Sequence, residues 1–155
     1  MKRIGVSVLV SVGILLASGC SNDTATEATV PKPIEVKFEI PKEVDTNKEE
    51  QLMIHVTQGT KNVNDADEVK FEIWKAGADE KSELIKATAA KKGMYAIQHR
   101  FSEAGVYFVQ THVTAHDMHN MPKTYVVAGD VPKAEVEKLT KDMDKEKSQH
   151  MPGHH

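Results

Sequence analysis

Apolar and polar residues alternate along most of the chain between residues 34 and 128, and this two-residue period predicts β-strands. The first stretch is the most regular, with four apolar residues on one face and three charged residues on the other, in the order Ile34, Glu35, Val36, Lys37, Phe38, Glu39 and Ile40. The same period recurs between turn-forming residues over 52–57, 69–74, 82–88, 94–101, 106–114 and 124–127. The pattern therefore predicts about seven short strands, of which 82–88 is the weakest and suits a sheet edge.

The connections between these segments contain no helical pattern, which favours antiparallel pairing. Tyr107 follows a turn at residues 103–105 and leads a strand of alternating apolar residues, an arrangement that resembles the tyrosine corner of immunoglobulin-like domains. We therefore predict an all-β fold, an immunoglobulin-like antiparallel β-sandwich of about seven strands. The inward-facing positions predict a core that contains Val36, Phe38, Leu52, Ile54, Val69, Phe71, Ile97, Tyr107 and Val109.

The period changes after Gly129. Val136, Leu139 and Met143 are spaced for one stripe of a helix, with Asp130 as the expected N-cap and Pro132 in the first turn. Three apolar residues over about four turns are few, so we expect this C-terminal helix to dock weakly. Residues 129–155 are thus predicted to form a helix up to residue 147, followed by a loose tail.

The beginning of the chain has the features of a lipoprotein signal peptide over residues 1–19. Two basic residues precede a short apolar stretch, and small residues then lead to Cys20, although Ala17 occupies the position where leucine is usual. Cleavage there would leave Cys20 for acylation, with palmitate as an expected chain. Residues 20–33 are small and polar and predict a flexible tether, followed by a folded domain over 34–128. The alternative is an ordinary secretory signal with an incidental cysteine.

Charge and cysteine content narrow the choice of partners. The chain has 20 basic and 23 acidic residues, and loss of Lys2 and Arg3 with the signal peptide changes the formal charge from −3 to −5. This balance argues against nucleic acid as a partner. Cys20 is the only cysteine, so no disulfide and no thiolate metal ligand are expected. We expect a monomer that is held by its lipid anchor at the outer face of the cytoplasmic membrane.

The run from His112 to Pro122 holds three of the eight histidines and two of the seven methionines. Imidazole suits copper and zinc, and thioether sulfur selects soft Cu(I). A straight strand would place His112 and His116 on one face but roughly 13 Å apart, too far to share an ion. A bend is therefore needed, and Asp117 and Asn120 are turn formers. The predicted copper ligands are His116, Met118, His119 and Met121, with His112 as a further ligand if the strand curls.

Other candidate residues carry less weight. The tail holds a secondary metal-binding set, because short histidine-rich tracts bind metals weakly without a fold: His150, Met151, His154 and His155. His55 and His99 each occur alone in a predicted strand, and we assign them no metal role. The sequence contains neither a Gly-x-Ser-x-Gly elbow nor a glycine-rich phosphate loop, so we expect no enzymatic activity.

Several of these segments together resemble the YtkA-like domain, which is related to FixH-like proteins: Gly93-Met-Tyr95 through Phe101, Glu103-Ala-Gly105-Val-Tyr107, and His112 through Pro122. The resemblance extends over about residues 34–128. It implies an immunoglobulin-like sandwich outside a membrane, and FixH-like proteins are associated with copper delivery to, or assembly of, respiratory oxidases. FixH-like proteins usually carry a transmembrane helix where this chain has its lipoprotein-like signal.

Two hypotheses of function follow from these observations. The first is a membrane-anchored lipoprotein that binds copper for buffering or for delivery, including delivery to a respiratory oxidase. The second is a non-enzymatic interaction module that docks on a membrane protein complex without any metal. Stoichiometric metal binding by the purified protein distinguishes them.

Overall fold

The computed structural model describes residues 30–149 of the chain. The predicted signal peptide, Cys20, most of the tether and the tail residues His150, Met151, His154 and His155 lie outside the described residues. Within the described part the elements follow in the order β1 (Ile34–Glu39), β2 (Glu43–Val44), β3 (Glu49–Gln58), β4 (Lys61–Asn62), β5 (Glu68–Lys75), a short 3-10 helix η1 (Asp79–Lys81), β6 (Glu83–Lys86), β7 (Thr88–Ala89), β8 (Met94–Arg100), β9 (Gly105–Ala115), β10 (Met118–Asn120), β11 (Lys123–Ala128) and α1 (Lys133–Gln149).

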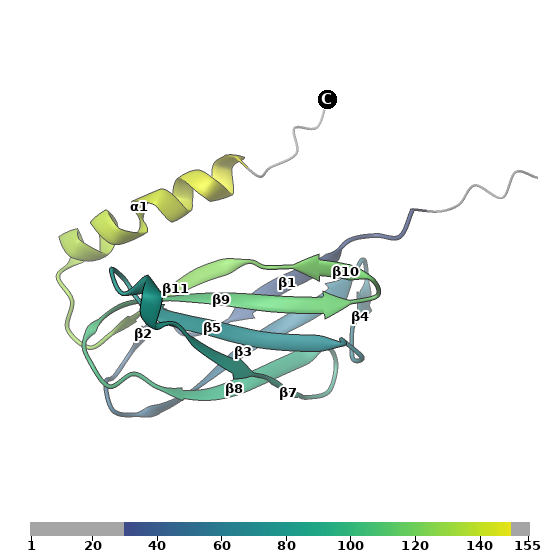
Figure 1. The fold of residues 1–155 in the computed structure, drawn as a ribbon, viewed down its shortest axis with the longest axis horizontal. Coiled ribbons are helices and arrows are strands. Elements are labelled where there is room, and N and C mark those ends of the chain that lie inside the picture. Colours follow the sequence, from purple (N-terminus) through teal and green to yellow (C-terminus); the bar gives the residue numbers. More distant parts are fainter. Residues whose placement is uncertain (1–29, 150–155) are drawn as a thin grey trace, which may run out of the picture. The chain divides into compact units, whose positions relative to one another are not determined.

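The strands form two sheets that pack face to face (Figure 1). The five-stranded sheet has the order β1-β3-β8-β7, with β4 added to β3, and the six-stranded sheet has the order β2-β11-β9-β5-β6, with β10 added to β9. All pairs are antiparallel except that of β2 and β11, which is parallel. The predicted fold class, an all-β immunoglobulin-like sandwich, is therefore confirmed, with one short parallel pair that the sequence pattern did not indicate.

The strand at 82–88 was predicted as one element, and the structure divides it. β6 pairs with β5 in the six-stranded sheet, whereas β7 pairs with β8 in the five-stranded sheet. Ala87 lies between them and donates its backbone N–H to the carbonyl of Val69 at 2.9 Å. The chain therefore crosses from one sheet to the other at this residue, and alternation alone cannot show such a crossing, because both halves keep the same period.

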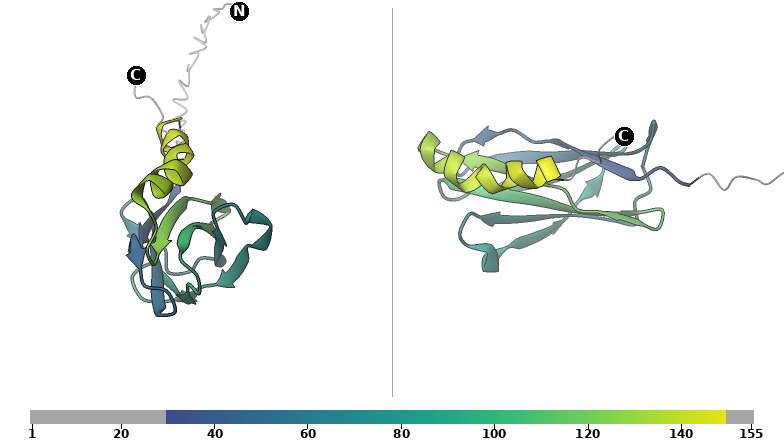
Figure 2. Two further views of the ribbon diagram at one scale, coloured as in Figure 1. Left: turned by 90° about the vertical axis from the view of Figure 1, so that its left-hand side faces the viewer. Right: turned by 90° about the horizontal axis from the view of Figure 1, so that it is seen from above.

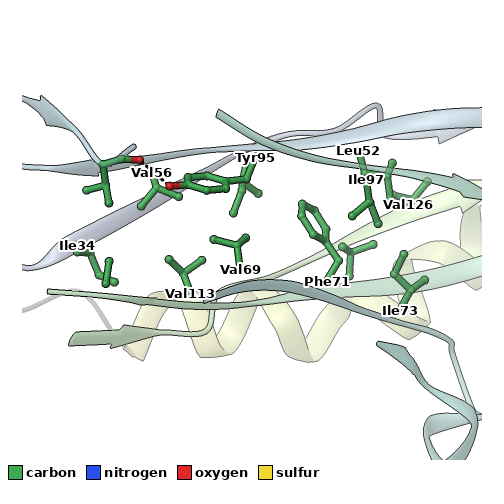
Figure 3. Packing of buried hydrophobic residues seen from close by; sticks show 14 of the residues in the cluster. Ile34, Leu52, Val56, Val69, Phe71, Ile73, Tyr95, Ile97, Val113 and Val126 are labelled. Carbon is green, nitrogen blue, oxygen red and sulfur yellow. Dashed lines mark hydrogen bonds between the residues drawn. The ribbon is translucent and has the colours of Figure 1, made fainter. Parts of the chain in front are cut away.

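The core lies between the inner faces of the two sheets (Figure 3). Six of the nine predicted core residues are buried: Leu52, Ile54, Val69, Phe71, Ile97 and Val109. The other three, Val36, Phe38 and Tyr107, are partly buried and pack against that cluster. The predicted register of the main strands is thus correct, because a shift by one residue would have moved every one of these side chains to the outer face.

Tyr107 closes the end of the sandwich where β8 and β9 meet. Its hydroxyl donates a hydrogen bond to the backbone carbonyl of Glu103 at 3.0 Å, four residues upstream. Its ring also packs against Phe101, edge to face, with 4.9 Å between ring centroids. This contact has the form of a tyrosine corner, as the sequence predicted.

Helix α1 lies outside the two sheets, next to β11 (Figure 2). It begins at Lys133, three residues after the predicted N-cap Asp130, and the backbone N–H groups of Glu135 and Val136 donate to the carbonyl of Pro132. The predicted role of Asp130 as N-cap is therefore wrong. Met143 is buried as expected, and Thr140, which the apolar pattern did not include, is buried beside it. Among the described residues, no helix has the length and apolar character needed to cross a membrane.

Candidate metal centre

The predicted bend in the histidine- and methionine-rich run is a tight hairpin. β9 and β10 are joined by His116 and Asp117, which have φ values of +52° and +60°. Two successive positive φ values are the geometry of the two-residue turns that connect antiparallel strands, and Asp tolerates this region better than most residues. The chain reverses here, and β10 returns along β9 with His119 opposite Thr114.

The register is continuous from β10 into β11. Asn120 lies opposite Val113 and Lys123 lies opposite Gln110, so the residue between them that faces His112 is Met121. The backbone N–H of Thr111 donates to the carbonyl of Pro122 at 3.0 Å, which makes that pair a hydrogen-bonded one. Since the two kinds of pair alternate, His112 and Met121 form a non-hydrogen-bonded pair, whose Cβ atoms are about 4.5–5.5 Å apart.

The hairpin therefore brings three of the five predicted ligands to one face, the outer face of the six-stranded sheet. His112 and His119 lie diagonally across β9 and β10, with 6.3 Å between their ring centroids and 48° between the ring planes. Met121 is 44% exposed. We call His112, His119 and Met121 the hairpin site.

The other two predicted ligands lie elsewhere. Met118 pairs with Ala115 and packs against the core, so its sulfur is on the inner side of the sheet. His116 lies in the turn, where Nδ1 is 2.9 Å from Oε1 of Gln58 and Nε2 is 3.3 Å from Oδ1 of Asp65. Both ring nitrogens of His116 are thus engaged, one by Gln58 at the end of β3 and the other by Asp65 in the loop between β4 and β5. The structure separates Met118 and His116 from the hairpin site, and the assignment of metal ligands stays a prediction.

Hydrogen bonds orient both imidazoles of the hairpin site. Nε2 of His112 is 2.9 Å from Oε2 of Glu72 on β5, and hydrogen bonds from His112 and then Ser82 hold the pKa of the Glu72 carboxyl below its ordinary value. An ionised carboxylate only accepts, so Nε2 carries the proton and Nδ1 keeps its lone pair in the neutral ring. Nδ1 of His119 is 2.9 Å from the Thr114 hydroxyl, which leaves Nε2 as the nitrogen available for a metal.

The separation of the two rings fits a shared ion. A metal–nitrogen bond of about 2.0 Å places an ion about 3.2 Å from each ring centroid, so two ligating rings on opposite sides have centroids about 6.4 Å apart. The observed 6.3 Å between ring centroids is within the separation that two imidazole ligands of one ion can span. Within residues 30–149, no three His, Cys, Asp or Glu side chains group closely enough to hold a metal by themselves. The thioether of Met121 is the further donor that the hairpin site offers beside the two imidazoles.

The charges around the hairpin site are balanced. Lys70 on β5 lies between His112 on β9 and Lys86 on β6. It forms an ion pair with Glu68 at 2.6 Å. Together with Glu72 these side chains add two positive and two negative formal charges. Hard divalent cations are held by converging carboxylates, which this face does not supply in the described structure. The surroundings are better suited to a soft monovalent ion.

Sequence reasoning did not find Glu72, because the carboxylate comes from a strand 40 residues before His112 and only the sheet register brings them together. Of the two histidines without an assigned role, His99 packs edge to face on Phe101 at 4.6 Å between centroids, and burial lowers its pKa. Nε2 of His55 lies 2.8 Å from Oδ1 of Asn62.

Comparison with solved structures finds likenesses at low sequence identity. A superoxide reductase (neelaredoxin) from Ignicoccus hospitalis has a TM-score of 0.45 at 13% identity over 64% of this chain and 82% of that chain. The soluble domain of PmoD from a Methylocystis species has a TM-score of 0.45 at 13% identity over 62% of this chain and 90% of that chain. A Bacteroides vulgatus protein assigned as a glycoside hydrolase has a TM-score of 0.43 at 17% identity over 59% of this chain, which spans only 17% of that protein.

A search of curated protein sequences finds no significant match. The family described as YtkA-like matches residues 28–112, which is more than half of the chain. The match includes Glu72 and ends at His112, so the hairpin that carries His119 and Met121 lies beyond it. The chain belongs to the YtkA-like family.

Proposed function

We propose that this protein is an extracytoplasmic lipoprotein, anchored through Cys20, that binds copper as Cu(I) at the hairpin site and buffers or delivers it. One observation carries the proposal: a two-residue turn folds the chain so that His112, His119 and Met121 share the outer face of one sheet. Two neutral imidazoles and one thioether supply no anionic ligand, a set that favours a soft monovalent ion over zinc.

The delivery role rests on the resemblance to FixH-like proteins, with a respiratory oxidase as the kind of complex that would receive the copper. The geometry supports such a role, because the three donors all come from one side. A ligand from a partner can approach from the solvent side of the sheet, and exposed Met121 lies on that side. Metal transfer between proteins requires an ion that a second set of ligands can reach.

The test is a Cu(I) competition titration of the full-length protein in detergent, with bathocuproine disulfonate as the competing chelator. Met121→Leu should weaken Cu(I) binding about tenfold or more, which corresponds to about 1.4 kcal/mol. Met118→Leu is the matched control, because it removes the same thioether from the same hairpin on its inner face. Binding should also weaken as the pH falls, because protons compete with the metal for the imidazole nitrogens.

Deletion of residues 148–155 should cost less affinity than Met121→Leu, because the tail is a secondary set of ligands. If the deletion abolishes Cu(I) binding and Met121→Leu does not, the site is in the tail and the hairpin assignment fails. If neither change has an effect and the intact protein binds no Cu(I), the metal role fails, and a docking module without metal takes its place.

A further inference from the structure

A second group of histidine and methionine side chains lies on the outer face of the other sheet. In β3, Met53 and His55 alternate with the buried residues Leu52, Ile54 and Val56, so both point away from the core. In the neighbouring strand β8, Met94 lies opposite His55. All three residues come from the two central strands of the five-stranded sheet (Figure 1). We call Met53, His55 and Met94 the β3–β8 site.

The register places these side chains within reach of one another. The backbone N–H of Val56 donates to the carbonyl of Gly93 at 2.8 Å, so the next pair, His55 and Met94, is a non-hydrogen-bonded one. In such a pair the Cβ atoms are about 4.5–5.5 Å apart. Met53 is two residues along the same face of β3, about 6.5–7 Å from His55, and diagonal to Met94. Long, unbranched thioether side chains readily span these separations.

The imidazole of His55 is already oriented. Its Nε2 is 2.8 Å from the side-chain oxygen of Asn62, an acceptor, so Nε2 carries the proton and Nδ1 keeps its lone pair. Gly93 allows the ring to lie close to the turn, because a Cβ there would be 3.2 Å from Cδ2 of His55 and 2.5 Å from the carbonyl oxygen of Val56. The Nε2 and Cδ2 edge thus faces the turn, and Nδ1 is on the other edge of the ring.

Met53 and Met94 do not pack in the hydrophobic core. Both are half-buried on a solvent-facing side and neither belongs to the apolar cluster between the sheets, whereas Met118 packs against that cluster. On β1, Lys37 lies opposite His55 and Glu39 lies opposite Met53, and these two charged side chains form an ion pair with each other at 3.3 Å. The β3–β8 site therefore offers one imidazole nitrogen and two thioether sulfurs, and the carboxylate that lies opposite Met53, that of Glu39, is paired with Lys37.

We propose that Met53, His55 and Met94 form a second binding site for a soft monovalent metal ion, Cu(I) or Ag(I). Thioethers select such ions, and a neutral donor set does little for zinc or calcium. The site is on the opposite sheet from the hairpin site, and it shares no residue with it. The proposal therefore stands whether or not the hairpin site binds copper.

The test uses Ag(I), which does not change oxidation state during a titration, with the full-length protein in detergent. The methionine methyl groups carry a 13C label, and the signals are assigned by substituting each methionine in turn. Addition of Ag(I) should shift the methyl signals of Met53 and Met94 together, whereas the signal of Met118, which faces the core, should stay in place. Calorimetry on the same sample should count one more bound ion than in the double variant Met53→Leu with Met94→Leu.

Leucine keeps the bulk of methionine and removes its sulfur, so the double variant should fold. Met118→Leu is the matched control and should retain every ion. The variant His112→Ala with His119→Ala should lose the hairpin site yet keep the shifts of Met53 and Met94, which separates the two proposals. The β3–β8 proposal is overturned if neither methyl signal shifts, or if the double leucine variant binds as many silver ions as the unmodified protein.

Discussion

Replacing Thr111 with valine should stabilise the protein. Thr111 is an inner-face residue of β9, fully buried, and it lies opposite Phe71 on β5. Its hydroxyl oxygen has no hydrogen-bond partner among the described residues. Valine has the same branched shape and places a methyl group where the unpaired hydroxyl now lies.

The expected gain follows from the cost of the hydroxyl. Burying a hydroxyl without a hydrogen bond costs about 1–3 kcal/mol by mutational data. Part of that gain is lost because a methyl group is larger than a hydroxyl and the core is close-packed. We therefore expect the free energy of unfolding to rise by about 1–2 kcal/mol. For a domain of this size the unfolding entropy is about 0.25 kcal/mol/K, so Tm should rise by about 4–8 °C.

Thr124 supplies a matched control. It is also buried, on the adjacent strand β11, but its hydroxyl accepts a hydrogen bond from Nζ of Lys42 at 3.1 Å. Thr124→Val removes that bond and should lower the free energy of unfolding by about 0.5–1.5 kcal/mol. Urea denaturation of both variants measures the difference, with an unchanged m value as the sign that only stability has changed. A Thr111→Val variant that is destabilised as much as Thr124→Val would refute the reasoning, because the Thr111 hydroxyl would then have a bound partner.

Three further predictions test other parts of the chain. Phe71→Ala should lower the free energy of unfolding by about 3–5 kcal/mol, because Phe71 is 0% exposed, and a loss below about 1 kcal/mol in urea denaturation would contradict its place in the core. Burial lowers the pKa of His99 from its ordinary value of 6.5, so its contribution to stability should be complete above about pH 6.5 and decline as the pH falls below it. His99→Gln should remove this decline, and an unchanged pH profile of stability would count against it. Cys20→Ser should move the protein out of the membrane fraction, and a variant that stays there after a carbonate wash would exclude the lipid anchor.

The alternation of apolar residues was sufficient to predict the main strands, the sandwich and most of the core, because a strand that is buried on one face alternates apolar and polar residues. Residues 82–88 show the limit of that signal, since the period is the same whether a strand stays in one sheet or crosses to the other. The beginning of α1 was predicted too early. Asp130 is a residue type that often caps helices, but the chain after Gly129 reaches helical geometry only at Lys133.

The candidate site was harder to predict than the fold. The turn at His116 and Asp117 contains no glycine. The sequence therefore indicated that the chain turns in this region, but not at which two residues it reverses direction. A two-residue turn decides which side chains share a face, and here it groups His112 with His119 and turns Met118 inward. The pairing of His55 with Met94 depends on the register between strands that are far apart in the sequence. Composition shows that such residues are present but not which of them are neighbours.

The hairpin is attached to the opposite sheet at two points, and these contacts order the proposed metal ligands before any ion binds. His116 contacts Gln58 and Asp65, and the side-chain amide of Asn120 donates to the carbonyl of Ile34 at 2.8 Å. The conformational entropy of the donor segment is therefore lost when the sandwich folds, before any ion arrives. The ligands of an ion at this site would already be in place. Its binding would therefore not require a loop to become ordered, and its release would not require a loop to become disordered. The proposed copper carrier would therefore take up and release its ion without a change of fold.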